Sequence, residues 1–306
     1  MSVNGTLFNL IRLLACAWTW SAVHADAAPP MDTRIHSTSF VTSDGVRLHV
    51  LETCPQGTPA ALDPAFPVIA FVPGWSMPAA IWREQLLALG ASHCVAALDP
   101  RGQGESEIAD SGYTIERRAT DVREFVARYP RVVLVGWSLG ALEALQYVHR
   151  YGHAALDALV LVDSSVGEDP APVPTPGPTF RDKLKQDRSA AVADFMRGVF
   201  GATRTDAEID ALTNAALRMP LEGSLTLFPS SVPRTHWRGI VRTFPKPLLY
   251  VVSTQFGAQA QSLRRKRPAT QIAIFADAGH ALFVDDPAKF NALLAKFVTT
   301  ATQPQR

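Results

Sequence analysis

Val132–Tyr151 reads VVLVGWSLGALEALQYVHRY, and this stretch decides how the rest of the chain is interpreted. It begins with a continuous apolar run, which is typical of a strand buried on both faces of a parallel sheet. From Leu139 on, apolar residues recur at helical spacing, and Gly152 stands where a helix commonly ends. The turn between strand and helix is G-W-S-L-G, with Ser138 at its centre. Ser138 either is a nucleophile or only caps the helix, and the flanking strand and helix favour the nucleophile.

Gly136 and Gly140 are expected from the geometry of such a turn. The backbones of the strand and the helix approach each other too closely there to leave space for side chains. The turn then holds the Ser138 hydroxyl above the edge of the sheet, at the positive end of the helix dipole. Ser138 is therefore the first candidate catalytic residue.

Strand and helix patterns alternate on both sides of this stretch. The first two strands are joined by Ser43-Asp44-Gly45, which is a hairpin turn signal. Such alternation predicts an α/β fold with a mainly parallel sheet and helices on both of its faces. The predicted strands are 38–42, 46–53, 68–72, 95–98, 132–135, 159–162, 248–252 and 272–275, and the predicted helices of this body are 82–89, 115–129, 139–151 and 287–298.

The alternation stops between residues 165 and 243. This segment opens with a Pro-rich stretch at 168–178, which cannot join a sheet, and helical patterns follow at 180–200 and 206–219. A separate C-terminal domain is the alternative, but strand patterns resume after residue 243. We therefore predict one α/β domain at 26–306, with a helical cap inserted after the sixth strand at about 165–243.

A serine nucleophile requires a base, and His280 has the position expected for it. His280 follows the last predicted strand and precedes the closing helix, which places it on a loop at the same sheet edge as Ser138. The other histidines lie in the N-terminal segments, in strand or helix patterns, or in the cap: His24, His36, His49, His93, His149, His153 and His236.

Several motifs together resemble the α/β-hydrolase superfamily. They are Pro73-Gly74-Trp75, DPRGQGES at 99–106, GWSLG at 136–140 and AGHALFVDDP at 278–287. The resemblance covers about residues 38–300 and is greatest to serine esterases, lactonases and cofactor-free haloperoxidases or perhydrolases. It implies an eight-stranded sheet and serine chemistry that needs no metal, nucleotide or flavin. Pro73 stands where these proteins often have a histidine, and this difference removes no catalytic group because the donor there is a backbone N–H.

An oxyanion hole requires backbone N–H groups aimed at the charge that develops on the substrate carbonyl. Leu139, directly after the serine, would supply one of them. The loop after the third strand would supply the other through the N–H of Trp75. The DPRGQGES stretch is interpreted as a structural turn.

The position of the acid that orients the histidine differs in this chain from its position in most of these proteins. The resemblance places it shortly after the seventh strand, where this chain has Phe256. No Asp or Glu occurs from Gly223 to Ala276, although eight basic residues do. The position at which most of these proteins have the acid therefore carries no carboxylate in this sequence.

Asp163 is the predicted orienting acid. It ends the sixth strand, at the sheet edge that carries Ser138, and some members of the superfamily place their acid there. Its alternative role is a buried carboxylate that caps the following turn. Asp277 and Asp285 are the fallbacks, and a Ser–His dyad without an acid is the last possibility.

The composition excludes some function classes. The 306 residues carry 29 Lys+Arg against 28 Asp+Glu, and 47% are hydrophobic. Nucleic-acid binding would require a basic surplus, so no nucleic-acid partner is predicted. The three cysteines form no C-x-x-C pair, which argues against a structural zinc site. No P-loop or G-x-G-x-x-G pattern is found, so no metal and no cofactor is predicted.

Residues 1–25 have the pattern of a secretory signal peptide. Arg12 precedes the short apolar run Leu13–Ala22, and small residues follow. Cleavage is expected after Ala25 or Ala27, which would give an exported, periplasmic or extracellular protein. The run has about ten residues, whereas a membrane span needs about twenty. A buried or membrane-surface helix is the alternative, and a lipoprotein signal at Cys16 is disfavoured because Arg12 shortens the apolar stretch before it.

Export would leave two cysteines, Cys54 and Cys94, and an even pair in an oxidising compartment is a candidate disulfide. Two unpaired cysteines packed as small apolar residues are the alternative. In the superfamily that the motifs resemble, the second and fourth strands are antiparallel neighbours. Cys54 lies just past the second strand and Cys94 just before the fourth, so the resemblance favours a bridge.

These residues together predict a carboxylic-ester hydrolase. His280 would take the Ser138 proton as Ser138 attacks an ester or lactone, and water would then hydrolyse the acyl-enzyme. The pocket for an apolar acyl part would be lined by Trp75, Trp137 and Met77, with Phe195 and Phe200 of the cap. The alternatives are a perhydrolase-like, haloperoxidase-like or C–C bond hydrolase on the same triad, and a non-catalytic binding protein. Epoxide hydrolase and dehalogenase chemistry is disfavoured, because it uses a carboxylate where this chain has Ser138.

Overall fold

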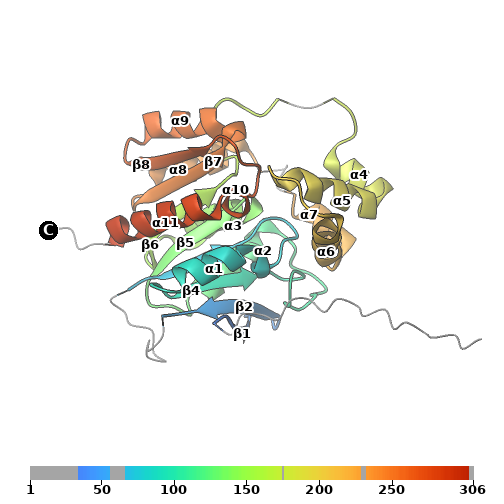
Figure 1. Ribbon diagram of the computed structural model, residues 1–306, viewed down its shortest axis with the longest axis horizontal. Helices are drawn as coiled ribbons and strands as arrows, with labels where there is room; N and C mark the ends of the chain where they lie inside the picture. The colour runs from blue at the N-terminus through green and yellow to red at the C-terminus, as the bar shows by residue number, and fades with distance from the viewer. Residues whose placement is uncertain (1–33, 56–65, 174–175, 229–231, 303–306) are drawn as a thin grey trace, which may run out of the picture. The chain divides into compact units, whose positions relative to one another are not determined.

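The computed structural model describes residues 34–55, 66–173, 176–228 and 232–302. They form an eight-stranded sheet in the order β1-β2-β4-β3-β5-β6-β7-β8 (Figure 1). Strand β2 is antiparallel to β1 and β4, and all other neighbours are parallel. The predicted fold class is confirmed. The strands are β1 (His36–Val41), β2 (Arg47–Thr53), β3 (Val68–Val72), β4 (Val95–Asp99), β5 (Val132–Trp137), β6 (Leu156–Val162), β7 (Leu248–Ser253) and β8 (Thr270–Phe275).

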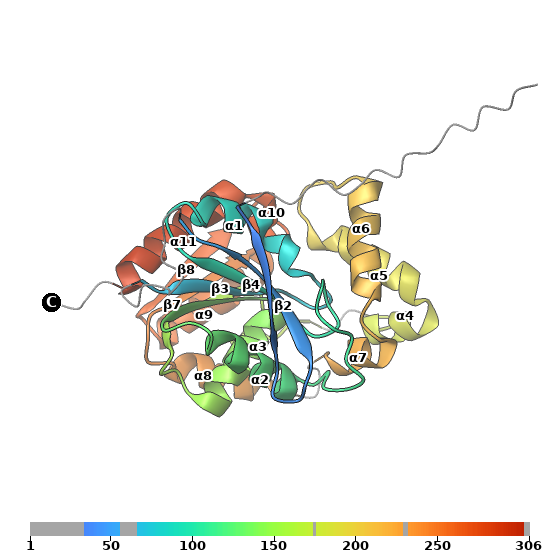
Figure 2. The same cartoon turned by 90° about the horizontal axis from the view of Figure 1, so that it is seen from below.

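Helices cover both faces of this sheet. The helices of the body are η1 (Ala79–Trp82), α1 (Arg83–Leu89), α2 (Ile115–Val126), α3 (Leu139–Tyr151), α8 (Arg234–Thr243), η3 (Thr254–Phe256), α9 (Gly257–Lys266), α10 (Leu282–Asp285) and α11 (Pro287–Thr302). On one face α1 packs against α11, and on the other α3 packs between α2 and α8 (Figure 2). Because both faces are covered, every residue of β3, β4, β5 and β7 is buried. This double burial accounts for the continuous apolar runs in the sequence.

Four further helices follow β6 and stand clear of the sheet, to the right in Figure 1. They are α4 (Phe180–Gln186), α5 (Arg188–Val199), α6 (Asp206–Leu217) and α7 (Leu221–Thr226). The helical pattern predicted over 180–200 is broken at Asp187, whose carboxylate caps α5 by accepting from the N–H of Ala190 at 3.0 Å. The predicted cap segment of 165–243 also included α8, which instead packs against α3 in the body.

Cys54 and Cys94 are joined by a disulfide between the end of β2 and the start of β4, with their Cα atoms 4.1 Å apart. Within the described ranges, no helix is both long enough and apolar enough to cross a membrane. The predicted signal peptide at 1–25 lies outside the described residues.

Candidate active site

Ser138 stands on the sharp turn between β5 and α3, with a backbone φ of 55° that side-chain-bearing residues rarely adopt. Its N–H donates to the carbonyl of Val162 in β6 at 2.9 Å. A Cβ on Gly136 would lie 2.4 Å from the carbonyl oxygen of Gly140, and a Cβ on Gly140 would lie 2.4 Å from that of Val72. These neighbours are backbone atoms that cannot move aside. Both glycines are thus required by close backbone approach, as the sequence predicts.

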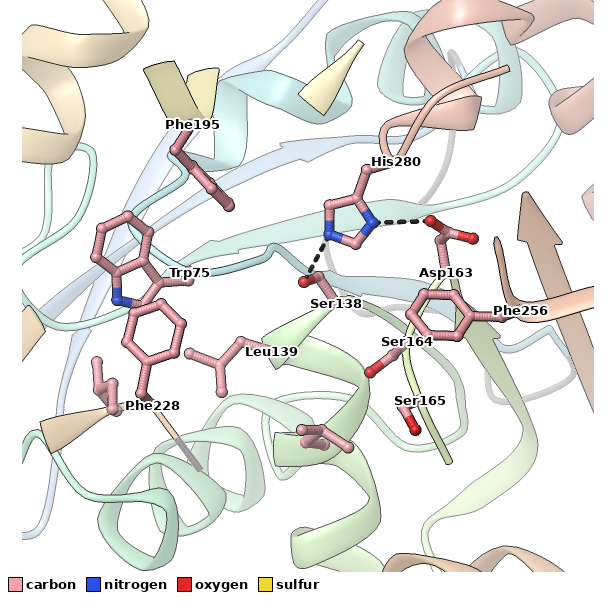
Figure 3. A pocket seen from close by; sticks show the side chains of 12 residues that line it. Trp75, Ser138, Leu139, Asp163, Ser164, Ser165, Phe195, Phe228, Phe256 and His280 are labelled. Carbon is pink, nitrogen blue, oxygen red and sulfur yellow. Dashed lines mark hydrogen bonds and ion pairs between the residues drawn. The ribbon is translucent and has the colours of Figure 1, made fainter. Parts of the chain in front are cut away.

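Ser138, His280 and Asp163 form one continuous series of hydrogen bonds (Figure 3). The Oγ of Ser138 lies 2.8 Å from Nε2 of His280, and Nδ1 of His280 lies 2.8 Å from Oδ2 of Asp163. The Asp163 side chain is fully buried, whereas the His280 side chain is 22% exposed. A carboxylate on Nδ1 holds the proton there and leaves Nε2 to accept the serine proton. The structure therefore brings together the three residues predicted as the triad.

Asp163 is held in place by the neighbouring strand β7. Its φ is 41°, and its N–H donates to the carbonyl of Val251 at 2.8 Å. Its Oδ1 accepts from the N–H of Ser253 at 2.5 Å, which leaves Oδ2 for His280. The end of β7 thus supplies a hydrogen-bond donor to an acid that stands on β6.

The two fallback carboxylates do not contact the His280 imidazole in the described part of the chain. Asp277 is exposed. Asp285 accepts from the N–H of Gly279 at 2.9 Å and from that of Gly201 at 2.7 Å. Asp285 therefore ties the loop before His280 to the cap, a role that the sequence motifs do not indicate.

A pocket of about 180 Å³ lies beside Ser138 and His280 (Figure 3). Its walls are apolar except for the triad and two hydroxyls. It is lined by Trp75, Ser138, Leu139, Leu142, Asp163, Ser164, Ser165, Phe195, Leu227, Phe228, Phe256 and His280. Apart from Asp163 and His280, none of these side chains is acidic or basic. Burial raises the pKa of Tyr250 well above its usual value, so its hydroxyl stays a donor and holds the Ser164 carbonyl at 2.6 Å.

The prediction that Trp137 and Met77 line this pocket is wrong. Neither side chain is among the residues that line it; Met77 is fully buried, and Trp137 is 1% exposed. Trp137 packs edge-on against Phe283 and donates its Nε1–H to the carbonyl of His280 at 2.9 Å. This hydrogen bond stabilises the loop that carries His280. Of the two cap residues expected in the pocket, Phe195 lines it and Phe200 does not.

Trp75 connects the body to the cap. Its ring centroid lies 5.4 Å from those of Phe180 and Phe195 and 5.3 Å from that of Phe228. Its indole N–H donates to the carbonyl of Ser224 at 3.1 Å. The side chain of this residue therefore forms part of the pocket wall, while its backbone belongs to the loop after β3.

The backbone N–H groups of Trp75 and Leu139 flank the nucleophile. A Cβ on Gly74 would lie 3.2 Å from the Cβ of Ser138, so the loop after β3 lies against the serine. Leu139 is the first residue of α3, where an N–H has no acceptor within the helix. Neither N–H donates a hydrogen bond to another group in the described ranges. Both donors predicted for an oxyanion hole are thus free.

A second Ser–His–Asp series, which the sequence patterns do not reveal, joins the first hairpin to the end of β4. Ser37 Oγ is 2.6 Å from Nε2 of His49, whose Nδ1 is 2.7 Å from Oδ2 of Asp99. Ser37 lies within the edge strand β1. Ser37 therefore has a hydrogen-bonded His–Asp pair, but it lacks the N–H groups that a helix N-terminus places beside Ser138. The comparison shows what distinguishes the GWSLG turn from a serine that is merely hydrogen-bonded.

The arrangement around Ser138 brings together a serine hydroxyl, an imidazole, a buried carboxylate and two free N–H donors, which are the kinds of group that acyl transfer requires. Among the described residues, no group of three or more His, Cys, Asp and Glu side chains is placed to hold a metal ion.

Comparison with known proteins agrees with this fold. The model of the Alpha/beta hydrolase family matches residues 69–293. N-formylmaleamate deformylase of Pseudomonas putida is 27% identical over 266 residues, which are 84% of this chain and 95% of that protein. Pimeloyl-[acyl-carrier protein] methyl ester esterase of Vibrio parahaemolyticus is 25% identical over 254 residues, 76% of this chain and 94% of that protein. The structure of an esterase from Exiguobacterium antarcticum superposes with a TM-score of 0.73 at 19% identity, covering 86% of this chain and 99% of that one. The chain therefore belongs to the alpha/beta hydrolase family.

Proposed function

We propose that this protein is a serine hydrolase that cleaves small, uncharged carboxylic esters, including lactones, through an acyl-enzyme on Ser138. One observation carries the proposal: the hydrogen-bonded series from Ser138 to His280 and Asp163 opens into an apolar pocket beside two free N–H donors. The similarity to a methyl ester esterase and to a deformylase, both of which act on carbonyl compounds by name, is consistent with acyl transfer.

In the first half of the reaction, Ser138 Oγ attacks the ester carbonyl carbon while its proton passes to Nε2 of His280. The carbonyl oxygen becomes an oxyanion that accepts from the N–H groups of Trp75 and Leu139. The C–O bond to the alcohol then breaks, and His280 returns the proton to the departing oxygen. In a lactone this oxygen stays tethered to the acyl chain.

In the second half, a water molecule attacks the acyl carbon and gives a proton to His280. The tetrahedral species uses the same two N–H groups, and its collapse releases the carboxylic acid and returns the proton to Ser138. The buried Asp163 carboxylate stabilises the imidazolium that forms in each half, because Oδ2 accepts its Nδ1–H.

The pocket favours a substrate that is small and neutral. Its volume of about 180 Å³ is below the roughly 300–1,000 Å³ of pockets that hold drug-sized ligands. Its lining offers no cation besides the catalytic imidazole, so a substrate carboxylate would be desolvated without a partner. The Pseudomonas deformylase is named for an anion, N-formylmaleamate, and this pocket does not favour such a ligand.

We further propose that the enzyme is exported. The proposal rests on the signal-peptide pattern at 1–25, and the Cys54–Cys94 pairing supports it because disulfides persist in oxidising compartments. Cell fractionation of the full chain, with N-terminal sequencing of the product, tests export. Recovery of the uncleaved chain from the cytoplasm would contradict it.

The catalytic proposal is tested by labelling with a fluorophosphonate probe. The wild type and Ser37→Ala should be labelled equally, and Ser138→Ala should not be labelled. Ser37 is a matched control because it also bonds a His–Asp pair. Labelling of Ser138→Ala at the wild-type rate would show that Ser138 is not the nucleophile.

The substrate proposal is tested with p-nitrophenyl esters of increasing acyl length and with neutral lactones. The value of kcat/KM should be highest for short acyl chains and fall once the chain exceeds the pocket. A p-nitrophenyl hemisuccinate, which carries a carboxylate, should be a poorer substrate than the butyrate, which is neutral. Equal rates on these two esters would refute the preference for neutral substrates.

A further inference from the structure

The loop that carries the Trp75 N–H is a strained turn. The N–H of Met77 donates to the carbonyl of Gly74 at 3.2 Å, which closes a four-residue turn. Ser76 within it has a φ of 57°, in the region that favours glycine. Ser76 is 1% exposed, and its hydroxyl has no hydrogen-bond partner among the described residues. The Ser76 side chain therefore adds no hydrogen bond to the turn, which is closed by one backbone hydrogen bond.

Gln103 bridges the two ends of this turn. Its Nε2 donates to the carbonyl of Met77 at 2.6 Å and to the carbonyl of Gly74 at 3.3 Å. Gln103 belongs to the DPRGQGES stretch, whose Gly104 has a φ of 49° and leaves no space for a Cβ beside the carboxylate of Asp99. This tight turn directs the Gln103 side chain inward, where it is 1% exposed.

The hydrogen bond to Gly74 bears on the oxyanion donor because a peptide group is planar. The carbonyl of Gly74 and the N–H of Trp75 belong to the same peptide unit, and they point in opposite directions. Fixing the direction of the Gly74 carbonyl therefore fixes the direction of the Trp75 N–H. A hydrogen bond accepted by the carbonyl also polarises the N–H of that unit.

The buried side chain of Arg118 holds Gln103 in this orientation. Nη1 of Arg118 donates to Oε1 of Gln103 at 3.1 Å, which keeps Nε2 facing the two carbonyls. Nη2 of Arg118 lies 3.0 Å from the Glu143 carboxylate, and both side chains are almost fully buried. Burial raises the pKa of Glu143 to about 7, against the opposing effect of Arg118. A buried guanidinium donates strong hydrogen bonds, so the amide of Gln103 is held firmly.

We propose that Gln103 is a positioning residue for the oxyanion hole: it holds the Gly74–Met77 turn so that the N–H of Trp75 points at the oxyanion. Arg118 and Glu143 act through it. The inference rests on the proposed function, because it concerns a donor of that same reaction. It extends the role of the DPRGQGES stretch from a structural turn to an element of the site.

The test compares Gln103→Met with the wild type, using a short p-nitrophenyl ester and a boronic acid inhibitor. A boronic acid forms a tetrahedral adduct with the serine and engages the oxyanion donors, whereas KM reports ground-state binding when the chemical step is slow relative to substrate dissociation. Loss of an oxyanion donor costs about 10²–10³ in kcat. A misdirected donor should cost less, so we expect kcat to fall about 10–100-fold. The inhibition constant should rise by a similar factor, with KM nearly unchanged.

The matched control is Gln146→Met. Gln146 is also a buried glutamine, 6% exposed, and its amide bonds His236 between α3 and α8, away from the pocket. This control should lose stability without losing affinity for the boronic acid. If Gln103→Met does not fold, Gln103→Glu carries the same test, since it keeps the acceptor for Arg118 and removes the donor to the turn.

Unchanged kcat and inhibition constant in a folded Gln103 variant would overturn the inference. An equal loss in Gln146→Met would also overturn it, because the effect would then be general destabilisation. Full activity of Ser138→Ala would instead refute the proposed function, so the two failures are distinguishable.

Discussion

Replacing Asp163 by Asn should disable the enzyme while leaving its fold intact. The two side chains have the same shape, and the N–H of Ser253 determines how the new amide lies. This N–H requires an acceptor at 2.5 Å, so the amide oxygen takes the place of Oδ1. The amide NH₂ group then faces Nδ1 of His280, 2.8 Å away. Because NH₂ can only donate, Nδ1 must be the unprotonated nitrogen.

The consequence falls on the other nitrogen of the ring. A neutral imidazole with an unprotonated Nδ1 carries its proton on Nε2, which lies 2.8 Å from Ser138 Oγ. It then cannot accept the serine proton. The same exchange in a serine protease lowers kcat by about 10⁴-fold, which corresponds to about 5.4 kcal/mol of transition-state stabilisation. We expect a similar loss here, since the Asp163 side chain is fully buried and no water can replace the carboxylate.

The assay is kcat on a short p-nitrophenyl ester, with the melting temperature measured in parallel. Asp163→Asn should melt close to the wild type, and Asp277→Asn should keep full activity because that side chain is exposed. A loss of less than tenfold in Asp163→Asn would refute the reasoning. Loss of activity in Asp277→Asn with Asp163→Asn active would assign the acid to the other carboxylate.

Three further outcomes are expected. Burial raises the pKa of Glu143 to about 7 from a reference of 4.5, so the unfolded chain releases this proton first and wild-type stability falls as the pH rises between these values. The free energy of unfolding of the wild type should fall by roughly 3 kcal/mol over this range, and Glu143→Gln should not show this fall when both are unfolded in urea at each pH. The same dependence on pH in the wild type and in the variant would contradict the expectation. Gly140→Ala places a methyl carbon 2.4 Å from the Val72 carbonyl oxygen and should destabilise by at least about 2 kcal/mol in denaturant unfolding, so unchanged unfolding would show that the turn can adapt. Cys94→Ser removes a link to Cys54 across 40 residues and should cost about 2–4 kcal/mol in unfolding without reductant, whereas equal stability would mean that the bridge does not form.

Much of the site could be predicted from local patterns. The nucleophile follows from a strand, a G-x-S-x-G turn and a helix in immediate succession, and the structure shows why both glycines are needed. His280 follows from its place between the last strand and the closing helix. Asp163 follows from the resemblance to the superfamily, some members of which place their acid after the sixth strand, together with the absence of acids between Gly223 and Ala276. For the serine and the histidine the signal lies within one short segment of the chain, whereas for Asp163 it joins two distant segments.

The pocket could be predicted only in part, since Trp75 and Phe195 line it as expected and Trp137, Met77 and Phe200 do not. Trp137 is adjacent to the nucleophile, yet it faces away from the pocket and supports the carbonyl of His280. A strand that is buried on both faces has no polar side to show which residues face the site. The aromatic wall joins Trp75 of the body to Phe195 and Phe228 of the cap, and no periodicity within one element indicates such a contact.

The sequence by itself determined the α/β fold, the order along the chain of the three triad candidates and the sheet edge at which they meet. These properties depend on strand and helix periods and on turn residues, which are local. Only the tertiary structure decided the full set of residues that line the pocket, the hydrogen bonds that attach Asp285 to the cap, and those from Gln103 to the Gly74–Met77 turn. Those contacts join segments distant in the chain, and packing, not spacing along the sequence, brings them together.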